Sequence, residues 1–417
     1  MTKKLNYLML VMLLASVSLN GFSQEKLKQD GEIPIITYGG VPEGTVERYL
    51  ELKEAGIDIC WAWTSIADAP KALDNAHKAG VKLLLSSNEL KTDTEKSVKS
   101  VMNHPALAGY VLADEPSISE FKGLSEWVKK IQAVDSKHFC YINLLPNYAT
   151  FHQLGMDNKQ LYGTSSYREY LEVFVKEVPV TFLSFDHYPV IEDKGVTCLR
   201  EQWYANLEDI RSISQKHGLP FWAYTLSVAH RIYPVPTVAE LRLQMYSNLA
   251  YGAQALQYFV YSGAGYEDYH HSPVSYGKRT EVYDRIKLVN HEIKALSGVF
   301  LNSKVTGVWH TGKFTPSPWV TSRLQEQNPP AMPPVKLLQT EGEGAVVSML
   351  EKENNSFLVI VNRDHQKPMR LTLIVDDSVK KIQKDGTIIP ANTYANTIEV
   401  DPGDAVVYTW KKNNNIK

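Results

Sequence analysis

Between residues 34 and 299 the chain alternates short apolar runs with stretches whose apolar residues recur every three to four positions. The short runs are rich in β-branched and aromatic residues and predict strands, whereas the periodic stretches predict amphipathic helices. The predicted strands span 34–38, 57–63, 81–86, 108–114, 139–145, 180–186, 220–226 and 255–261. Most of these runs are continuously apolar, which is typical of strands buried on both faces of a parallel sheet.

Eight strand–helix repeats over this length match the roughly 250 residues of a (β/α)8 barrel. A doubly wound nucleotide-binding sheet is the main competing fold, but the segment after the first strand, 39–44, reads Gly-Gly-Val-Pro-Glu-Gly and lacks the GxGxxG order. We therefore predict an α/β protein with a (β/α)8 TIM barrel over residues 24–299.

After residue 300 the pattern changes to short alternating runs separated by turn residues. These runs span 344–351, 356–362, 369–375, 396–400 and 405–410. Alternation of this kind predicts an all-β domain, which we expect to be a β-sandwich over residues 300–417. A proline-rich segment at 312–334 interrupts it, either as a linker or as a loop folded over the barrel.

Residues 1–23 have the three regions of a secretory signal peptide. Lys3 and Lys4 precede an apolar run at 8–17, and small and polar residues follow at 21–24. We expect cleavage near Ser23 and a secreted or periplasmic location. Because a membrane-spanning helix needs about 20 apolar residues and no later run is that long, no transmembrane segment is expected in the mature protein.

Composition and charge narrow the classes of partner. The chain is 44% hydrophobic and 22% charged, and Lys+Arg 44 against Asp+Glu 46 gives a formal charge of −2. Without a basic block, nucleic acid is not an expected partner. Three cysteines do not form a disulfide framework, and neither a zinc-binding spacing nor a cofactor motif occurs, so we predict no metal and no cofactor. Nothing in the sequence indicates an oligomeric state.

The residues that close the predicted strands carry the candidate chemistry, because the active site of a (β/α)8 barrel lies at the C-terminal ends of its strands. The fourth strand closes on Asp114 and Glu115, the sixth on Asp186, and the second on Trp61 and Trp63. Hydrolysis of a glycosidic bond requires two carboxyl groups, one that protonates the leaving oxygen and one that attacks carbon or activates water. This pattern therefore predicts a glycosidase with a carbohydrate substrate.

At the end of the fourth strand, Asp114-Glu115-Pro116 resembles the acid/base motif of the clan A retaining glycoside hydrolases, which include the family 42 β-galactosidases. The resemblance implies an exported bacterial glycosidase in which Glu115 is the general acid. Asp114 stands where the clan usually has an asparagine that contacts the sugar. The nucleophilic glutamate that the clan carries at the end of the seventh strand is absent from 223–227.

We therefore take Asp186 as the second catalytic carboxylate, acting as base or nucleophile, with Glu267 or Asp268 as alternatives. The capping of the following helix is a competing role for Asp114 and Glu115. The stretch 267–271 also contains metal-ligand residue types, but polar loops are common after barrel strands, so no metal is predicted there.

Further polar and aromatic residues near the strand ends are predicted to bind the substrate. They are Asp114, Trp61, Trp63, Asn143, His187, Tyr188, Tyr224, Tyr258 and Tyr261. Trp61 and Trp63 share one side of their strand, which either faces the pocket or belongs to the core.

The leading hypothesis is an exported glycoside hydrolase that acts on an oligosaccharide or polysaccharide. The missing seventh-strand glutamate suggests an alternative, a catalytically inactive barrel that binds glycans. A lyase or an esterase is a further alternative, although the chain contains no G-x-S-x-G motif.

Overall fold

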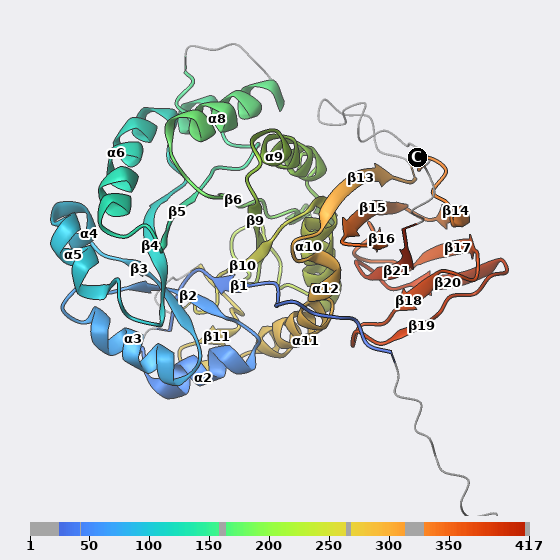
Figure 1. Ribbon diagram of the computed structural model, residues 1–417, viewed down its shortest axis with the longest axis horizontal. Helices are drawn as coiled ribbons and strands as arrows, with labels where there is room; N and C mark the ends of the chain where they lie inside the picture. The colour runs from blue at the N-terminus through green and yellow to red at the C-terminus, as the bar shows by residue number, and fades with distance from the viewer. Residues whose placement is uncertain (1–24, 42, 158–163, 264–267, 313–328, 413–417) are drawn as a thin grey trace, which may run out of the picture.

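The computed structural model describes residues 25–41, 43–157, 164–263, 268–312 and 329–412. A barrel surrounded by helices forms one part of the molecule, and a smaller β domain packs beside it (Figure 1). The predicted signal peptide and most of the proline-rich segment 312–334 lie outside the described residues.

Eight parallel strands form the barrel in the order β5-β4-β3-β2-β1-β10-β9-β6. These strands are β1 (Ile35–Thr37), β2 (Ile59–Trp63), β3 (Lys82–Ser86), β4 (Leu107–Asp114), β5 (Phe139–Asn143), β6 (Leu183–Phe185), β9 (Phe221–Leu226) and β10 (Ala255–Phe259). The barrel closes between β5 and β6, where Leu144 bridges to Phe185 and its N–H donates to the carbonyl of Ser184 at 2.8 Å. The predicted (β/α)8 barrel is confirmed.

Helices cover the outside of the barrel (Figure 1). They are α2 (Val46–Glu54), α3 (Ala69–Lys78), α4 (Glu89–Thr92), α5 (Thr94–Val101), α6 (Ile118–Val134), α7 (Phe151–Leu154), α8 (Thr164–Glu177), α9 (Trp203–His217), α10 (Val238–Tyr251), α11 (Glu281–Ala295) and α12 (Ser297–Phe300). Capping residues and glycines determine where these helices begin and end. Thr237 and Glu240 cap α10 reciprocally, and α9 stops at Gly218 with a φ of 66°. Among the described helices, none is long and apolar enough to cross a bilayer.

Two short hairpins interrupt the barrel repeats. One consists of β7 (Val190–Asp193) and β8 (Val196–Leu199), and the other of β11 (Val274–Ser275) and β12 (Lys278–Arg279). Both follow barrel strands, β6 and β10, and so lie at the same end of the barrel as the candidate site.

The β domain consists of two antiparallel sheets. A six-stranded sheet has the order β13-β15-β16-β21-β18-β19, and a three-stranded sheet has the order β14-β17-β20. Their strands are β13 (Lys304–His310), β14 (Val335–Glu341), β15 (Ala345–Lys352), β16 (Asn355–Asn362), β17 (Met369–Val375), β18 (Lys380–Ile382), β19 (Ile388–Pro390), β20 (Asn396–Val400) and β21 (Ala405–Lys411). A core that includes Leu358, Ile360, Leu371 and Trp410 lies between the sheets, so the predicted sandwich is confirmed.

The sandwich is packed firmly on the barrel. Alternate residues of the six-stranded sheet, such as Val346 and Val359, belong to the same apolar core as helix α10. Ser348 also donates a hydrogen bond to the carbonyl of Ala250 at 2.7 Å, and Tyr251 bonds to His310 at 2.7 Å. The two domains therefore share buried surface.

The N-terminal described segment joins both domains before it enters β1. Lys26 forms an antiparallel bridge with Thr387 of the sandwich, and Leu27 donates its N–H to the carbonyl of Gly386 at 2.8 Å. Two residues later, the side chain of Gln29 donates to the carbonyl of Ala295 in α11 at 2.7 Å. This segment thus runs along the junction of barrel and sandwich (Figure 1).

Candidate active site

Three carboxyl groups meet at the C-terminal mouth of the barrel. Asp114 is the last residue of β4, Glu115 follows it, and Asp186 follows β6. The N–H of Glu115 donates to the carbonyl of Asn143 at 2.8 Å, which keeps the end of β4 paired with the end of β5. Barrel closure therefore brings together residues that are far apart in the sequence.

Asn143 connects two of these carboxyl groups. Its Nδ2 donates to Oδ1 of Asp114 at 3.1 Å and to Oδ1 of Asp186 at 2.8 Å, while its own Oδ1 accepts from the hydroxyl of Ser184 at 2.9 Å. Because every polar atom of the amide has a partner, the orientation of Asn143 is fixed. The structure thus brings Asn143 and both aspartates into one site.

A second layer of hydrogen bonds lies below Asn143. Gln257 of β10 donates from Nε2 to the Ser184 hydroxyl at 2.8 Å, and the Tyr141 hydroxyl donates to Oε1 of Gln257 at 2.6 Å. The hydroxyl of Tyr141 also lies 3.2 Å from that of Tyr224 on β9. This buried network connects four strands and supports the carboxyl groups above it.

The carboxyl groups of Glu115 and Asp186 form a hydrogen bond with each other. Burial, and then the charges of Glu115 and Asp114, raise the pKa of Asp186 well above its usual range. Desolvation by the surrounding barrel mouth and the charge of Asp114 also raise the pKa of Glu115, although part of this residue remains open to solvent. Among the described residues no cation pairs with these carboxyl groups, so burial and the neighbouring negative charges favour the protonated form of Asp186.

Helix capping does not account for Asp114 and Glu115. The N–H of Ser117 donates to Oε2 of Glu120 at 2.8 Å, so α6 provides its own capping interaction. Glu115 has a φ of 53°, a left-handed conformation that is costly for a residue with a side chain. Backbone strain of this kind is concentrated at functional sites, and here it falls on the predicted acid.

Trp61 and Trp63 both face the inside of the barrel but at different depths. Trp61 is 2% exposed, with its ring 4.5 Å from that of Tyr38 and 5.1 Å from that of Tyr141. Trp63 is 51% exposed and lies 5.2 Å from Tyr38. Both tryptophans line a cavity of about 470 Å³. Trp61 forms its floor, and Trp63 forms its rim.

This difference in depth predicts different results for the two alanine variants. Trp63→Ala should leave the melting temperature almost unchanged and weaken glycan binding. Trp61→Ala should cost about 3–5 kcal/mol of unfolding free energy, because it removes a buried indole that its neighbours enclose. Thermal denaturation and calorimetric glycan titration of both variants check this expectation. Equal loss of stability in the two variants would contradict it.

Tyr188 and Tyr224 also lie at the site. Both belong to a buried cluster with Leu226 and Val260, and the ring of Tyr188 lies 5.6 Å from that of Phe259. Burial, followed by the charge of Asp186, raises the pKa of Tyr188 well above its usual range, so this phenol stays neutral.

His187 is buried beside Asp186 and does not act as a charged group. Its Nδ1 lies 2.9 Å from Oδ1 of Asn206, and burial lowers its pKa to about 3. Its Nε2 has no hydrogen-bond partner among the described residues, and the ring of Tyr148 lies 4.9 Å away. His187 is therefore a neutral residue next to the acid cluster.

The structure corrects the prediction for Tyr258 and Tyr261. The Tyr258 hydroxyl donates to Oδ1 of Asn290 in α11 at 2.7 Å, on the outer side of the barrel. Tyr261 is buried in the same apolar layer between strands and helices. Because strand side chains alternate, the inward positions of β10 belong to Gln257 and Phe259, and neither tyrosine reaches the mouth.

The alternative second carboxylates are not part of the described cluster. Glu267 lies outside the described residues, and Asp268 is exposed in the loop after β10. Nearby, His271 pairs with Glu281 at 2.8 Å. Among the described residues no group of three histidine, cysteine or acidic side chains is arranged to hold a metal ion.

Several site residues were not predicted from the sequence. The guanidinium of Arg200 lies 4.4 Å from the ring centre of Tyr148 and donates to the hydroxyl of Tyr233 at 3.0 Å. All three lie in loops, where no periodicity marks them. Tyr38 directly follows the first strand, so its position alone could have identified it.

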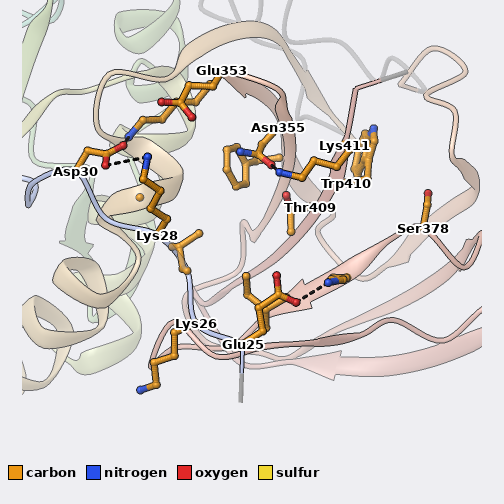
Figure 2. A pocket seen from close by; sticks show the side chains of 16 residues that line it. Glu25, Lys26, Lys28, Asp30, Glu353, Asn355, Ser378, Thr409, Trp410 and Lys411 are labelled. Atoms are coloured by element: carbon orange, nitrogen blue, oxygen red, sulfur yellow. Dashed lines mark hydrogen bonds and ion pairs between the residues drawn. The ribbon is translucent and has the colours of Figure 1, made fainter. Parts of the chain in front are cut away.

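A further cavity of about 270 Å³ lies at the junction of the N-terminal segment and the sandwich (Figure 2). Several of its charged residues pair with each other, as Lys28 does with Asp30 at 3.3 Å and Lys380 with Glu25 at 2.5 Å. None of the predicted site residues lines it, so it is separate from the candidate active site.

Solved structures similar to this chain share its fold at low identity. An α-amylase from Anoxybacillus is 11% identical with a TM-score of 0.51, over 92% of this chain and 98% of that one. An α-amylase from Geobacillus thermoleovorans is 9% identical with a TM-score of 0.50, over 91% and 98%. A β-galactosidase from the psychrophilic Marinomonas ef1 is 12% identical with a TM-score of 0.43. The match covers 65% of this chain, which spans only 61% of the length of that β-galactosidase.

No curated protein matches the chain. Residues 160–296 match the model of the glycoside hydrolase family 42, described as beta-galactosidase. The matched region contains Asp186, Tyr188 and Tyr224 and ends directly after α11, whereas Asp114 and Glu115 lie outside it. The chain is therefore a (β/α)8 barrel protein in which residues 160–296 are similar to glycoside hydrolase family 42, and the predicted resemblance to that family is confirmed.

Proposed function

We propose that this protein is an exported glycoside hydrolase that cleaves a β-galactosidic bond with Glu115 and Asp186. The observation that carries the proposal is the hydrogen-bonded pair of these two carboxyl groups at the mouth of the barrel. The family 42 match suggests β-galactosides as the first substrates to test.

In this proposal one shared proton serves both carboxyl groups. Glu115 needs the proton in order to donate it to the leaving oxygen, and Asp186 must then be ionised in order to attack carbon or activate water. Transfer of the proton across their hydrogen bond, from Asp186 to Glu115, produces both states in one step. Asp114 helps to keep the proton in the pair, because its charge raises the pKa of each partner.

Substrate binding must separate the two groups. The two carboxyls stand roughly 5–5.5 Å apart in retaining enzymes and 6.5–9.5 Å apart in inverting ones, further than a direct hydrogen bond. Asp186 is buried and held by Asn143, whereas Glu115 is exposed. In our proposal Glu115 therefore turns toward the glycosidic oxygen while Asp186 stays in place.

A second candidate is a catalytically inactive barrel that binds glycans. The observation that favours it is the end of β9, where Leu226 and Ser227 stand in place of a carboxylate. In this alternative the aromatic residues Trp61, Trp63 and Tyr188 bind sugar rings, and the carboxyl cluster only accepts hydrogen bonds from hydroxyl groups.

One screen tests both candidates. The purified protein is incubated with aryl β-galactosides, lactose and plant, algal and host glycans, and new reducing ends are measured. Hydrolysis by the wild-type protein and its loss in the Glu115→Gln variant are the expected results. Binding of several glycans without any cleavage would replace the hydrolase with the inactive barrel.

The exported location rests on residues 1–23, which have the pattern of a signal peptide. We propose cleavage near Ser23. The N-terminal sequence and mass of the protein recovered from the native organism should show a chain that begins at or near Gln24. Retention of Met1 would contradict this part of the proposal.

A further inference from the structure

Two cavities adjoin at the mouth of the barrel. The first, of about 470 Å³, is the one above Trp61, and it extends over the ends of β1 and β2. The second, of about 610 Å³, lies over the ends of β3 and β4 and includes Ser86 and Trp127. Trp63 and Thr64 line both cavities, so the two form one trough, which we call the Trp63–Trp127 trough.

The two tryptophans of the trough are fixed by neighbouring groups. Trp63 meets Tyr38 and Trp61 at interplanar angles of 70° and 62°, and half of its side chain is open to solvent. Trp127 donates from its indole nitrogen to the carbonyl of Leu90 at 2.9 Å. Because contacts with the protein set their orientation, these rings lose little conformational freedom when a ligand packs against them.

Polar side chains line the second cavity together with the two tryptophans. They are Ser86, Ser87, Asn88, Glu89 and Lys91, and the Nζ of Lys91 lies 5.9 Å from the ring centre of Trp127. Aromatic rings suit the apolar C–H faces of pyranoses, and hydroxyl, amide and carboxylate groups suit their hydroxyls. The trough thus has the mixed lining that a chain of sugars requires.

The trough lies at the same end of the barrel as the carboxyl pair and exceeds the size of one sugar ring. Val111 and Leu112 of β4 line its second cavity, and β4 ends at Asp114, directly before Glu115, although none of the three carboxyl residues lines the trough itself. Each cavity alone falls within the roughly 300–1,000 Å³ of pockets that hold whole small-molecule ligands. A single monosaccharide at the carboxyl groups would leave most of this volume empty.

We infer that the Trp63–Trp127 trough binds additional sugar units of an extended oligosaccharide, so that the substrate is a chain of several sugars. This inference rests on the proposed function for the cleavage of the bound oligosaccharide. Binding of the oligosaccharide in the trough does not require cleavage. Trp63 is the platform at the centre of the trough, and Trp127 is the platform at its far end.

Binding is measured with a Glu115→Gln protein, which does not consume the ligand. Isothermal titration uses β-1,4-linked galacto- and cello-oligosaccharides of two to six units. We expect affinity to rise with chain length beyond the disaccharide in at least one series. In that background, Trp63→Ala and Trp127→Ala should each weaken binding of the hexasaccharide about tenfold, the scale of one lost aromatic contact.

Tyr394→Ala is the matched control, because Tyr394 is an exposed aromatic residue of the β domain. It should leave hexasaccharide binding unchanged, and melting temperatures should show that every variant is folded. Affinity that does not change with chain length in either series, or that resists both tryptophan substitutions, overturns the inference. Length-dependent binding without cleavage by the wild-type protein supports the trough and overturns the hydrolase.

Discussion

Glu115→Gln is expected to lower kcat on natural glycosides by about 10²–10⁴, the usual contribution of a general acid. The amide keeps the size of the carboxyl group but has no transferable proton for the leaving oxygen. Glycosides with good aryl leaving groups need little protonation, so their bond-breaking step should slow much less. Steady-state kinetics on a natural glycoside and on aryl glycosides of graded leaving-group pKa measure this difference.

Glu120→Gln is the matched control for this substitution. Glu120 lies on the same segment but interacts with Ser117 at the start of α6, and glutamine can take the same capping position. Its activity should equal that of the wild type on every substrate. Full activity of Glu115→Gln on a natural glycoside would exclude Glu115 as the acid.

Asp186→Asn should abolish hydrolysis and, at the same time, make the protein more stable above neutral pH. In the folded state the pKa of Asp186 is raised, so the folded protein holds a proton that the unfolded chain releases at lower pH. Stability therefore falls as pH rises from the unfolded pKa toward the folded one. Asparagine is never charged, and its oxygen can still accept from Asn143.

The expected gain is about 0.5–2 kcal/mol of unfolding free energy at pH 8, as is common when a strained functional group is removed. It should vanish near pH 4. Thermal unfolding at both pH values measures it. Asp209→Asn is the contrasting variant, because Asp209 is buried and accepts a hydrogen bond from Arg168, so its loss should destabilise the protein. A loss of stability at pH 8 in both variants would contradict a proton held by Asp186.

The sequence predicts the barrel well because its strands are buried on both faces. Nearly continuous apolar runs, such as 81–86 and 220–226, are typical of strands buried on both faces, and their alternation with helical stretches favours a parallel sheet. Two short strands of the sandwich are not predicted, because they lack such runs. β18 and β19 are three residues each and only partly buried, so their pattern does not differ from that of a loop.

The site is predicted less completely, because it depends on the direction and depth of side chains. Tyr258 lies near a strand end, as Tyr224 does, yet the phase of alternation turns it toward α11. Trp61 and Trp63 have the predicted phase, but only the closed barrel reveals that Tyr38 and Tyr141 bury one of them.

Contacts between strands that are distant in the sequence are the part of the site that no local sequence pattern predicts. The bridge from Asn143 to both aspartates requires β4, β5 and β6 to close side by side. Burial of Asp186 then decides its protonation, and burial is a property of the whole barrel.

The N-terminal segment also has a consequence for how the chain folds. Residues 26 and 27 lie shortly before the first barrel strand and pair with residues 386 and 387 of the sandwich, near the other end of the described chain. Such pairing raises the contact order of the molecule. It can form only after residues 386 and 387 have been synthesised, so the N-terminal segment reaches its place on the sandwich long after it has left the ribosome.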